Sequence, residues 1–575
     1  MNNIWLKSYP QGVPAQIDTE HLPTLNELQA GICARFAGKP AFSSLGGTIS
    51  FAELAEQSAA FAAYLINDLA LVRGERVALM MPNLLQYPVA LFGVLRAGGV
   101  VVNVNPLYTP RELHHQLADS GASVIVVLDQ FAHVVQEAMA GTSLRHVIVT
   151  RIGDLLHFPR AQLADFTVAH IKHLVPEWHI DLARPFNEAL SRGRGRAPKY
   201  ITVRPEDAAF LQYTGGTTGV PKGAVLTHAS VAANVEQTLA WVSHVLKEGE
   251  EVAVIPLPMY HIFALTTTLC FFALGARNVL ITNPRDLHGF VKEIRNLRFS
   301  AMIGVNTLFH ALLEAEGSDE IDCSAVKVIV AGGMAVQTSV ARRWQERFGM
   351  PIIEGYGLTE TSPIVCANPL DGHFHTGSVG LPVPSTEVCL LDEEGAEVPP
   401  HETGEIAVRG PQVMRGYWNL PAETAGVFTQ DGWLRTGDIG TFTEEGYLKI
   451  LDRKKELINV SGFKVFPNEV ENVVAMHPGV LEVAAIPAPD ERAGEVVKIV
   501  VVRRDASLTE DVLMAHCRAN LTSYKVPRYI VFRDEPLPKS NIGKILRRVV
   551  RDQENTASPA AGQHTAAAPD AAAAS

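Results

Sequence analysis

Short apolar runs rich in β-branched residues alternate with longer amphipathic segments in the first part of the chain. Residues 77–81, 100–104 and 124–128 are such runs, and residues 51–65 carry apolar positions at helical spacing. An alternation of buried strand and helix is typical of βαβ units, which build a largely parallel sheet. The pattern therefore predicts an α/β layer here.

A second set of apolar runs follows and repeats the same texture. Residues 252–256, 279–282, 301–304 and 326–331 each have the length and composition of a buried strand near a helix. We therefore expect an α/β fold in which a large N-terminal domain, residues 1–452, contains two α/β layers.

The pattern changes after residue 380 to short alternating strands separated by turns. Glu387–Leu391 and residues 405–408 have the length of short strands, and Glu393-Glu394-Gly395 is a turn signal between them. Residues 380–450 are therefore predicted to form a small β-rich subdomain. Residues 453–552 follow as a smaller C-terminal α/β domain, and residues 553–575, mostly Ala, Pro, Thr and Ser, as a disordered Ala-rich tail.

Composition narrows the class of protein. The 575 residues are 47% hydrophobic and 19% charged, so the chain can bury several cores. A formal net charge of −12 argues against nucleic acid as the main partner, because phosphate binding requires clustered Lys and Arg. The most apolar stretches, residues 89–104 with Arg96 inside and residues 262–274 with three threonines, are shorter than a membrane span and predict buried core.

Cysteine usage and the N-terminus bear on the compartment. The six cysteines stand far apart without a CxxC pair, which disfavours a disulfide framework or a structural zinc site. Residues 1–16 contain no apolar stretch followed by small residues, as a secretion signal would. We therefore expect a protein of the cytoplasm.

The strongest chemical signal is a loop rich in glycine and threonine after the apolar residues 208–211. Glycines let the backbone curl so that its N–H groups point inward, hydroxyls add donors, and a lysine adds charge, which together suit a polyphosphate. The spacing differs from that of a Walker A loop, because Val220 and Pro221 separate the last loop glycine from the lysine. The predicted nucleotide contacts in it are Tyr213, Thr214, Gly215, Gly216, Thr217, Thr218, Gly219 and Lys222.

This loop resembles the signature of the adenylate-forming superfamily, which contains acyl-CoA synthetases, luciferases and peptide-synthetase adenylation domains. Within it, residues 431–464 are most similar to bacterial long-chain fatty acyl-CoA synthetases, and the resemblance covers residues 24–551. The further matching motifs, in order, are Pro258-Met259-Tyr260-His261, Ala331-Gly332-Gly333-Met334, the run from Glu354 to Thr361, Thr436-Gly437-Asp438, Asp452-Arg453-Lys454-Lys455 and the run from Pro538 to Lys544.

The resemblance implies a role for each matching residue in nucleotide binding. A carboxylate suits a hard cation, and the resemblance gives Mg²⁺ to Glu360 together with the hydroxyl of Thr214. Asp438 and Arg453 would bind the ribose hydroxyls. The residues expected around adenine and the phosphates are Gly333, Met334, Glu354, Gly355, Tyr356, Gly357 and Thr359.

The same resemblance implies the residues of chemistry and of domain movement. Lys544 would bind both the substrate carboxylate and the α-phosphate, and His261 would lie beside the acyl site. Some long-chain relatives have a tryptophan gate where this chain has Leu265. The C-terminal domain is expected to rotate about Lys455 and to bring the thiol-channel segment Ser461, Gly462, Phe463 and Lys464 to the acyl group.

The leading hypothesis is an AMP-forming ligase that joins a long-chain fatty acid to coenzyme A with ATP and Mg²⁺. Two alternatives remain open: an enzyme that loads its acyl-adenylate onto a carrier protein, and a non-catalytic adenylate-binding or membrane-associated protein. Chain-length preference, a homodimer and peripheral contact with the inner face of the cell membrane are also left open.

Overall fold

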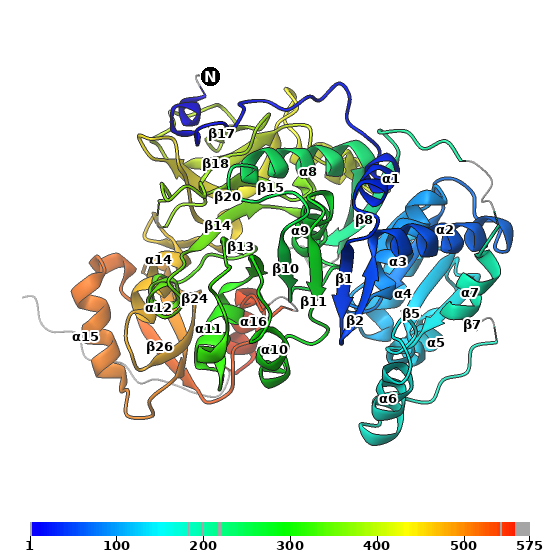
Figure 1. Ribbon diagram of the computed structural model, residues 1–575. Helices are drawn as coiled ribbons and strands as arrows, with labels where there is room; N and C mark the ends of the chain where they lie inside the picture. Colours follow the sequence, from blue (N-terminus) through cyan, green and yellow to red (C-terminus); the bar gives the residue numbers. More distant parts are fainter. Residues whose placement is uncertain are drawn as a thin grey trace, which may run out of the picture. The chain divides into compact units, whose positions relative to one another are not determined.

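The computed structural model describes residues 3–181, 183–196, 201–214, 221–375, 377–490, 492–540 and 543–557. The chain divides into two compact units, Met1–Lys454 and Lys455–Ser575. Both combine helices with sheets, as predicted (Figure 1).

The first unit contains a nine-stranded sheet that is parallel over most of its width. Strands β1, β11, β10, β12, β13 and β14 run parallel, while β2 at one edge and β15 and β16 at the other are antiparallel. In sheet order the strands are β16 Leu381–Pro382, β15 Ile364–Ala367, β14 Ile352–Gly357, β13 Val328–Ala331, β12 Ala301–Gly304, β10 Val252–Ile255, β11 Arg277–Leu280, β1 Pro40–Ser44 and β2 Gly47–Ser50.

An eight-stranded sheet forms the second layer of this unit. Strands β8, β4, β3, β5, β6 and β7 are parallel, and β9 and β19 continue the sheet in antiparallel pairing. In sheet order the strands are β19 Gly416–Tyr417, β9 Lys222–Thr227, β8 Ala208–Thr214, β4 Val100–Asn103, β3 Arg76–Met80, β5 Val124–Leu128, β6 His146–Thr150 and β7 Ala183–Pro185. The two predicted α/β layers are thus confirmed.

Helices join the two sheets through one apolar core. Helix α3 packs on β3 and β4, helix α9 packs on β10 and β11, and α1 contacts both helices. Phe272 of α9 lies at the centre of this core, with ring centroids 5.0–6.2 Å from Phe42, Phe51 and Phe92. The helices are α1 Leu25–Arg35, α2 Phe51–Asn67, α3 Gln86–Arg96, α4 Pro110–Ser120, α5 Ala132–Ala138, α6 Arg160–Phe166, α7 Phe186–Gly193, α8 His228–Val242, α9 Ile262–Ala273, α10 Leu287–Ile294, α11 Asn306–Glu314, α12 Thr338–Phe348 and α13 Pro421–Val427.

Helix α9 confirms that the apolar run after His261 is core. All twelve of its residues are buried, including its threonines. Thr267 donates its hydroxyl to the carbonyl of Phe263 one turn earlier, which satisfies a polar group inside the helix. Among the described residues, the structure contains no helix long and apolar enough to cross a membrane.

The predicted β-rich subdomain is a four-stranded antiparallel sheet. Its strands are β17 Glu387–Leu391, β18 Gly404–Arg409, β20 Leu434–Phe442 and β21 Leu448–Arg453, in that order. Buried Val388, Leu390, Ile406 and Val408 form its core with Phe442. The last strand ends next to the unit boundary, so the subdomain belongs to the first unit.

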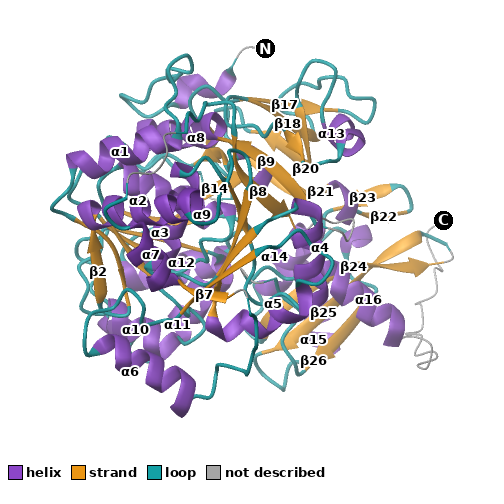
Figure 2. Ribbon diagram, turned by 90° about the vertical axis from the view of Figure 1, so that its right-hand side faces the viewer, coloured by secondary structure: helices purple, strands orange, loops and turns teal. Residues whose placement is uncertain are grey.

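The second unit is built on a five-stranded sheet, β23-β22-β25-β24 with β26 paired to β25. Strands β24, β25 and β26 run beside one another (Figure 2). The strands are β22 Ile458–Val460, β23 Phe463–Val465, β24 Val480–Asp490, β25 Gly494–Arg503 and β26 Tyr529–Arg533, and the helices are α14 Pro467–Ala475, α15 Glu510–Asn520 and α16 Arg547–Ala557.

Helix α16 corrects the predicted start of the tail. Residues 553–557, assigned to the disordered tail from composition, belong to this helix. Glu554 is buried, and its carboxylate forms ion pairs with Lys498 at 2.7 Å and with Arg533. Composition alone could not predict that residues 553–557 are helical, because the residues that pair with Glu554 come from β25 and β26. Residues 558–575 lie outside the described part of the chain.

Candidate active site

The predicted phosphate loop begins and ends on a pair of antiparallel strands. Thr214 ends β8, Lys222 begins β9, and the two residues are paired across the strands. The predicted contacts Gly215, Gly216, Thr217, Thr218 and Gly219 lie outside the described residues. Thr214 and Lys222 are therefore held side by side by the sheet, whatever path connects them.

Tyr213, the next-to-last residue of β8, has a fixed side chain. Its hydroxyl donates to the carboxylate of Asp119, and burial together with that carboxylate raises the pKa of Tyr213. A Cβ atom at Gly223 would lie only 3.1 Å from the Tyr213 ring, so the glycine allows the close approach of β8 and β9. The side chain of Tyr213 thus fixes the strand, while its backbone leads into the loop.

The metal candidate and the phosphate lysine meet in one polar cluster. Glu360 lies in the short 3-10 turn Thr359–Thr361, which contacts both β8 and β9. Tyr417 donates its hydroxyl to Oε1 of Glu360 at 2.7 Å. The ammonium of Lys222 lies 5.4 Å from the Tyr417 ring centroid and forms an ion pair with Glu423.

Tyr417 and Glu423 are site residues that sequence reasoning missed. They lie 57 residues from Glu360 and 201 residues from Lys222, respectively, so no local spacing connects the partners. The available signal was the sequence Gly416-Tyr417-Trp418, an aromatic pair after a glycine, which alone has no functional meaning.

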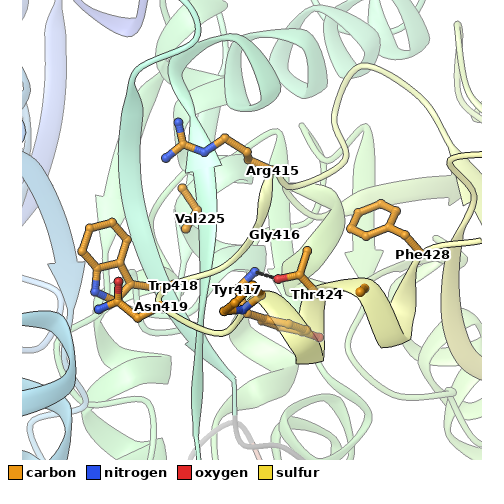
Figure 3. Close-up of a pocket in the computed structure, with 10 residues that line it drawn as sticks. Val225, Arg415, Gly416, Tyr417, Trp418, Asn419, Thr424 and Phe428 are labelled. Carbon is orange, nitrogen blue, oxygen red and sulfur yellow. Dashed lines mark hydrogen bonds between the residues drawn. The ribbon is translucent and has the colours of Figure 1, made fainter.

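A pocket of about 460 Å³ opens beside this cluster and shares Tyr417 with it (Figure 3). The backbone N–H of Tyr417 donates to the hydroxyl of Thr424 at 2.9 Å, which ties β19 to helix α13. The remaining lining residues are Val225, Arg415, Gly416, Trp418, Asn419, Pro421, Ala425 and Phe428.

The two residues predicted to bind ribose are brought together with the predicted adenine residue Tyr356. The Tyr356 hydroxyl donates to Oδ2 of Asp438 at 2.6 Å, and Nε of Arg453 lies 2.7 Å from Oδ1 of the same carboxylate. Asp438 and Arg453 are also directly paired between β20 and β21. Burial and the Asp438 carboxylate raise the pKa of Tyr356, so its hydroxyl stays a donor. Both carboxylate oxygens of Asp438 are thus oriented before any nucleotide binds.

We expect Tyr356→Phe to weaken nucleotide binding by releasing this carboxylate. A hydrogen bond to a charged group contributes about 1.5–3 kcal/mol, so the KM for ATP should rise roughly tenfold or more while kcat changes less. Tyr447→Phe is a matched control, because Tyr447 also donates its hydroxyl to a distant segment, the carbonyl of His373. Equal changes in the KM for ATP in both variants would contradict a specific role for Tyr356.

The other adenine candidates lie on and around β14. Glu354 accepts a hydrogen bond from the backbone of Val336 at 2.9 Å, and burial raises the pKa of Glu354 to about 7. A Cβ atom at Gly355 would come to 3.2 Å from the Cys366 carbonyl. A Cβ atom at Gly357 would lie only 1.9 Å from the carbonyl oxygen of Pro363, so this position accepts only glycine.

The neighbouring turn contains Gly333 and Met334. Gly333 has φ of +79°, in the region that favours glycine, and the half-buried Met334 packs against the main core. Gly332 faces the ring of Phe263 on α9, where a Cβ atom would come to 3.0 Å. This contact places the beginning of α9, next to His261, beside the turn that carries the adenine candidates.

His261 caps the N-terminus of α9. Its Nδ1 accepts from the backbone N–H of Phe263 at 3.3 Å, and burial lowers the pKa of His261 to about 4. The ring is therefore neutral at physiological pH. Leu265, one turn later, is completely buried. The aliphatic side chain fills the position where long-chain relatives were expected to carry a tryptophan.

The remaining candidates belong to the second unit or its boundary. Two hydrogen bonds join the backbone of Lys544 to Ser540. The carbonyl of Lys544 accepts from the backbone N–H of Ser540 at 2.7 Å, and the N–H of Lys544 donates to the hydroxyl of Ser540. Lys455 is exposed and is the first residue of the unit.

The thiol-channel candidates form a hairpin between β22 and β23. Ser461 and Gly462 have φ of +50° and +87°, as the tightest hairpin turns require at both central positions. Phe463 is 59% exposed and stacks on Tyr524 with ring centroids 5.0 Å apart, and Lys464 follows it on β23. A Cβ atom added at Gly462 would have no other atom within 4 Å.

This fold and this cluster define an AMP-binding enzyme, and the chain belongs to that family. Residues 30–418 match the AMP-binding enzyme family, and residues 469–544 match the AMP-binding enzyme C-terminal domain. A long-chain-fatty-acid–CoA ligase of Escherichia coli is 53% identical over 554 residues, covering 96% of this chain and 98% of the relative. Its counterpart in Bacillus subtilis is 37% identical with the same coverage.

Solved structures agree with this assignment. An anthranilate CoA ligase in complex with anthranoyl-AMP aligns with a TM-score of 0.83 and 25% identity, covering 94% of this chain and 99% of the other. ATP-bound MatB from Rhodopseudomonas palustris aligns with a TM-score of 0.78 and 27% identity, covering 92% and 99%.

Proposed function

We propose that this protein is a long-chain fatty acid:CoA ligase that acts through an acyl-adenylate. The single observation that carries the proposal is 53% identity to a long-chain-fatty-acid–CoA ligase over nearly the full length of both chains. The first half-reaction joins the carboxylate to the α-phosphorus of ATP and releases pyrophosphate. In the second, the thiol of coenzyme A attacks the acyl carbon and AMP leaves.

The first half-reaction needs positive charge at the phosphates and the attacking carboxylate. Lys222 supplies a cation next to the loop, and the Tyr356, Asp438 and Arg453 arrangement holds the ribose end of the nucleotide. Lys544 contributes the charge that lies between carboxylate and α-phosphate during attack. Such preorganised charge stabilises the transition state because no solvent must reorganise when the bond forms.

Glu360 and Thr214 fit a Mg²⁺ ion. The donor set is hard oxygen, and the turn that carries Glu360 contacts the strand that ends at Thr214. Tyr417 orients one carboxylate oxygen of Glu360 with its hydroxyl. When bound, the ion supplies charge neutralisation at the phosphate oxygens.

Thiol attack requires a different set of groups. His261 lies at the start of the apolar α9, and burial keeps its ring neutral by lowering its pKa, so it suits the boundary between an acyl chain and a polar reaction centre. The exposed hairpin at Ser461 and Gly462 presents a narrow backbone edge past which a pantetheine arm can pass. Six free cysteines, five of them buried, support action in a reducing compartment, the cytoplasm.

The expected substrate preference tests this proposal. Each methylene that enters an apolar tunnel contributes about 0.8 kcal/mol, so kcat/KM should rise about fourfold per methylene through the medium chain lengths and then level off. AMP release should be measured for acids from acetate to oleate, with coenzyme A present and absent. A preference for acetate or an aromatic acid over palmitate would refute the long-chain assignment.

A further inference from the structure

The segment from residue 157 to 174 exposes apolar side chains to an unusual degree. Five of the fourteen large hydrophobic side chains that are exposed among the described residues lie in it. Their exposed fractions run from 49% at Leu174 to 82% at Phe158. We call these five the α6 apolar face; they are Phe158, Leu163, Phe166, Ile171 and Leu174.

The backbone of this segment brings the five side chains close together. Helix α6 continues directly into the π-helical turn Thr167–Ile171, so four of the five residues follow one another within or just after one helical rod. Neither α6 nor the π-turn has a buried residue. Figure 1 shows α6 at the lower end of the first unit, below α5. A helix without a buried face gains nothing from the core, so its apolar residues require another explanation.

The segment is nevertheless attached to the body of the first unit. The carboxylate of Asp165 accepts from the backbone N–H of Gly153 at 2.8 Å. The guanidinium of Arg160 donates to the carbonyl of Gly46, and Leu156 packs on the main core just before the segment begins. The polar groups on its inner side thus fix the helix and leave the apolar side chains outward.

The charge of the segment favours an anionic surface. Lys172 is exposed, and the single acidic residue between 157 and 174, Asp165, is directed to Gly153. The chain as a whole has a net charge of −12 and would be repelled by an anionic membrane. A local combination of apolar and basic residues is what an interfacial helix requires. The acidic Glu177 and Asp181 follow beyond it.

We propose that the α6 apolar face docks the enzyme on the surface of a lipid bilayer, where its side chains enter the boundary between headgroups and acyl chains. A stable protein partner would need about 20 to 30 residues on each side, many more than this face offers, whereas a bilayer accepts a small patch. The benefit rests on the proposed function: a long-chain fatty acid dissolves in membranes, so an enzyme held there meets its substrate.

Vesicle binding by the full-length protein tests the docking surface without using catalysis. Flotation with vesicles of phosphatidylcholine and phosphatidylglycerol should recover the parent, and the triple variant Phe158→Ser, Phe166→Ser, Ile171→Ser should partition at least ~10-fold less. A matched control is the double variant Val72→Ser, Leu107→Ser, which removes apolar side chains of 63% and 52% exposure elsewhere in the same unit. It should bind as the parent does.

Lys172→Glu separates the electrostatic contribution. It should reduce binding to the mixed vesicles and leave binding to phosphatidylcholine vesicles unchanged. Activity on octanoate in solution should be normal in every variant, while activity on palmitate supplied in vesicles should fall in the triple variant.

An environment-sensitive dye gives a local readout that does not depend on the triple variant folding. Leu163→Cys labelled with such a dye should shift its emission to the blue when vesicles are added, and Leu107→Cys should not; both parent side chains are exposed. Vesicle binding by the triple variant equal to that of the parent, the same dye response at both positions, or loss of self-association instead of vesicle binding would each overturn the proposal. Failure of the ligase assay with intact vesicle binding would instead refute the proposed function.

Discussion

Lys544→Ala is expected to slow acyl-adenylate formation by a factor of ~10² to 10³, the range for loss of one preorganised charge at a transition state. Thioester formation from supplied acyl-adenylate should be nearly unchanged, because the carboxylate and phosphate are already joined in that substrate. The two half-reactions should be measured separately, by pyrophosphate release without coenzyme A and by thioester formation from synthetic acyl-adenylate.

Lys539→Ala is the matched control for this prediction. Lys539 lies five residues before Lys544. Its neighbour Ser540 makes the two hydrogen bonds with the backbone of Lys544. The ammonium of Lys539 forms an ion pair with Glu482. This variant should retain both half-reactions within a few fold. Equal loss of adenylation and thiolysis in Lys544→Ala would show that the lysine acts on the fold or on both steps, against the assigned role.

Gly462→Leu is expected to slow thioester formation at least tenfold and to leave adenylation within a few fold. The substitution places a bulky side chain on the exposed hairpin turn between β22 and β23, where a Cβ atom meets no other atom within 4 Å. Any obstruction would therefore fall on a ligand and not on the protein. The measurement is again the pair of half-reactions.

The left-handed backbone of Gly462 requires its own control. Gly462→Ala carries the same conformational cost at φ of +87° without the bulk, so it should preserve thioester formation better than Gly462→Leu. If both variants lose thiolysis equally, backbone strain and not obstruction is the cause.

A variant at the unit boundary tests the rotation that this account requires. Lys454 forms an ion pair with Glu405 of the first unit at 3.0 Å, and Glu456 pairs with Arg547 of the second. Lys455 thus lies between two anchored residues. Lys455→Pro, which restricts φ there, should slow thiolysis far more than adenylation, and the reverse pattern would contradict a pivot at this residue.

Much of the fold could be predicted because its strands are buried on both faces. The runs at Val124–Leu128, Ala301–Gly304 and Glu387–Leu391 are strands with these bounds. Elsewhere the observed strands begin or end one or two residues away from the predicted runs. The half-buried Arg76 and Arg277, for example, are the first residues of β3 and β11. The end of the last helix was missed because its ion pairs come from distant strands.

The candidate site was predictable where function resides in a local motif. Gly355 and Gly357 of β14 lie close to other backbone segments, where a side chain would be crowded, and they belong to one short stretch of sequence. The contact between Tyr356 and Asp438 joins residues 82 apart, and the hydrogen bond between Tyr417 of β19 and Glu360 of a 3-10 turn joins residues 57 apart. Such partners depend on tertiary structure, which no spacing in the chain encodes.

The central claim, ligation through an acyl-adenylate, is tested most directly by following the carboxylate oxygen. Palmitate labelled with the heavy stable isotope in both carboxylate oxygens should be incubated with the enzyme, ATP and coenzyme A, and the products analysed by mass spectrometry. One labelled oxygen is expected in AMP and the other in the thioester carbonyl, because the attacking oxygen stays on phosphorus when the thiol displaces AMP. Label in inorganic phosphate with formation of ADP, or AMP without label, would contradict it.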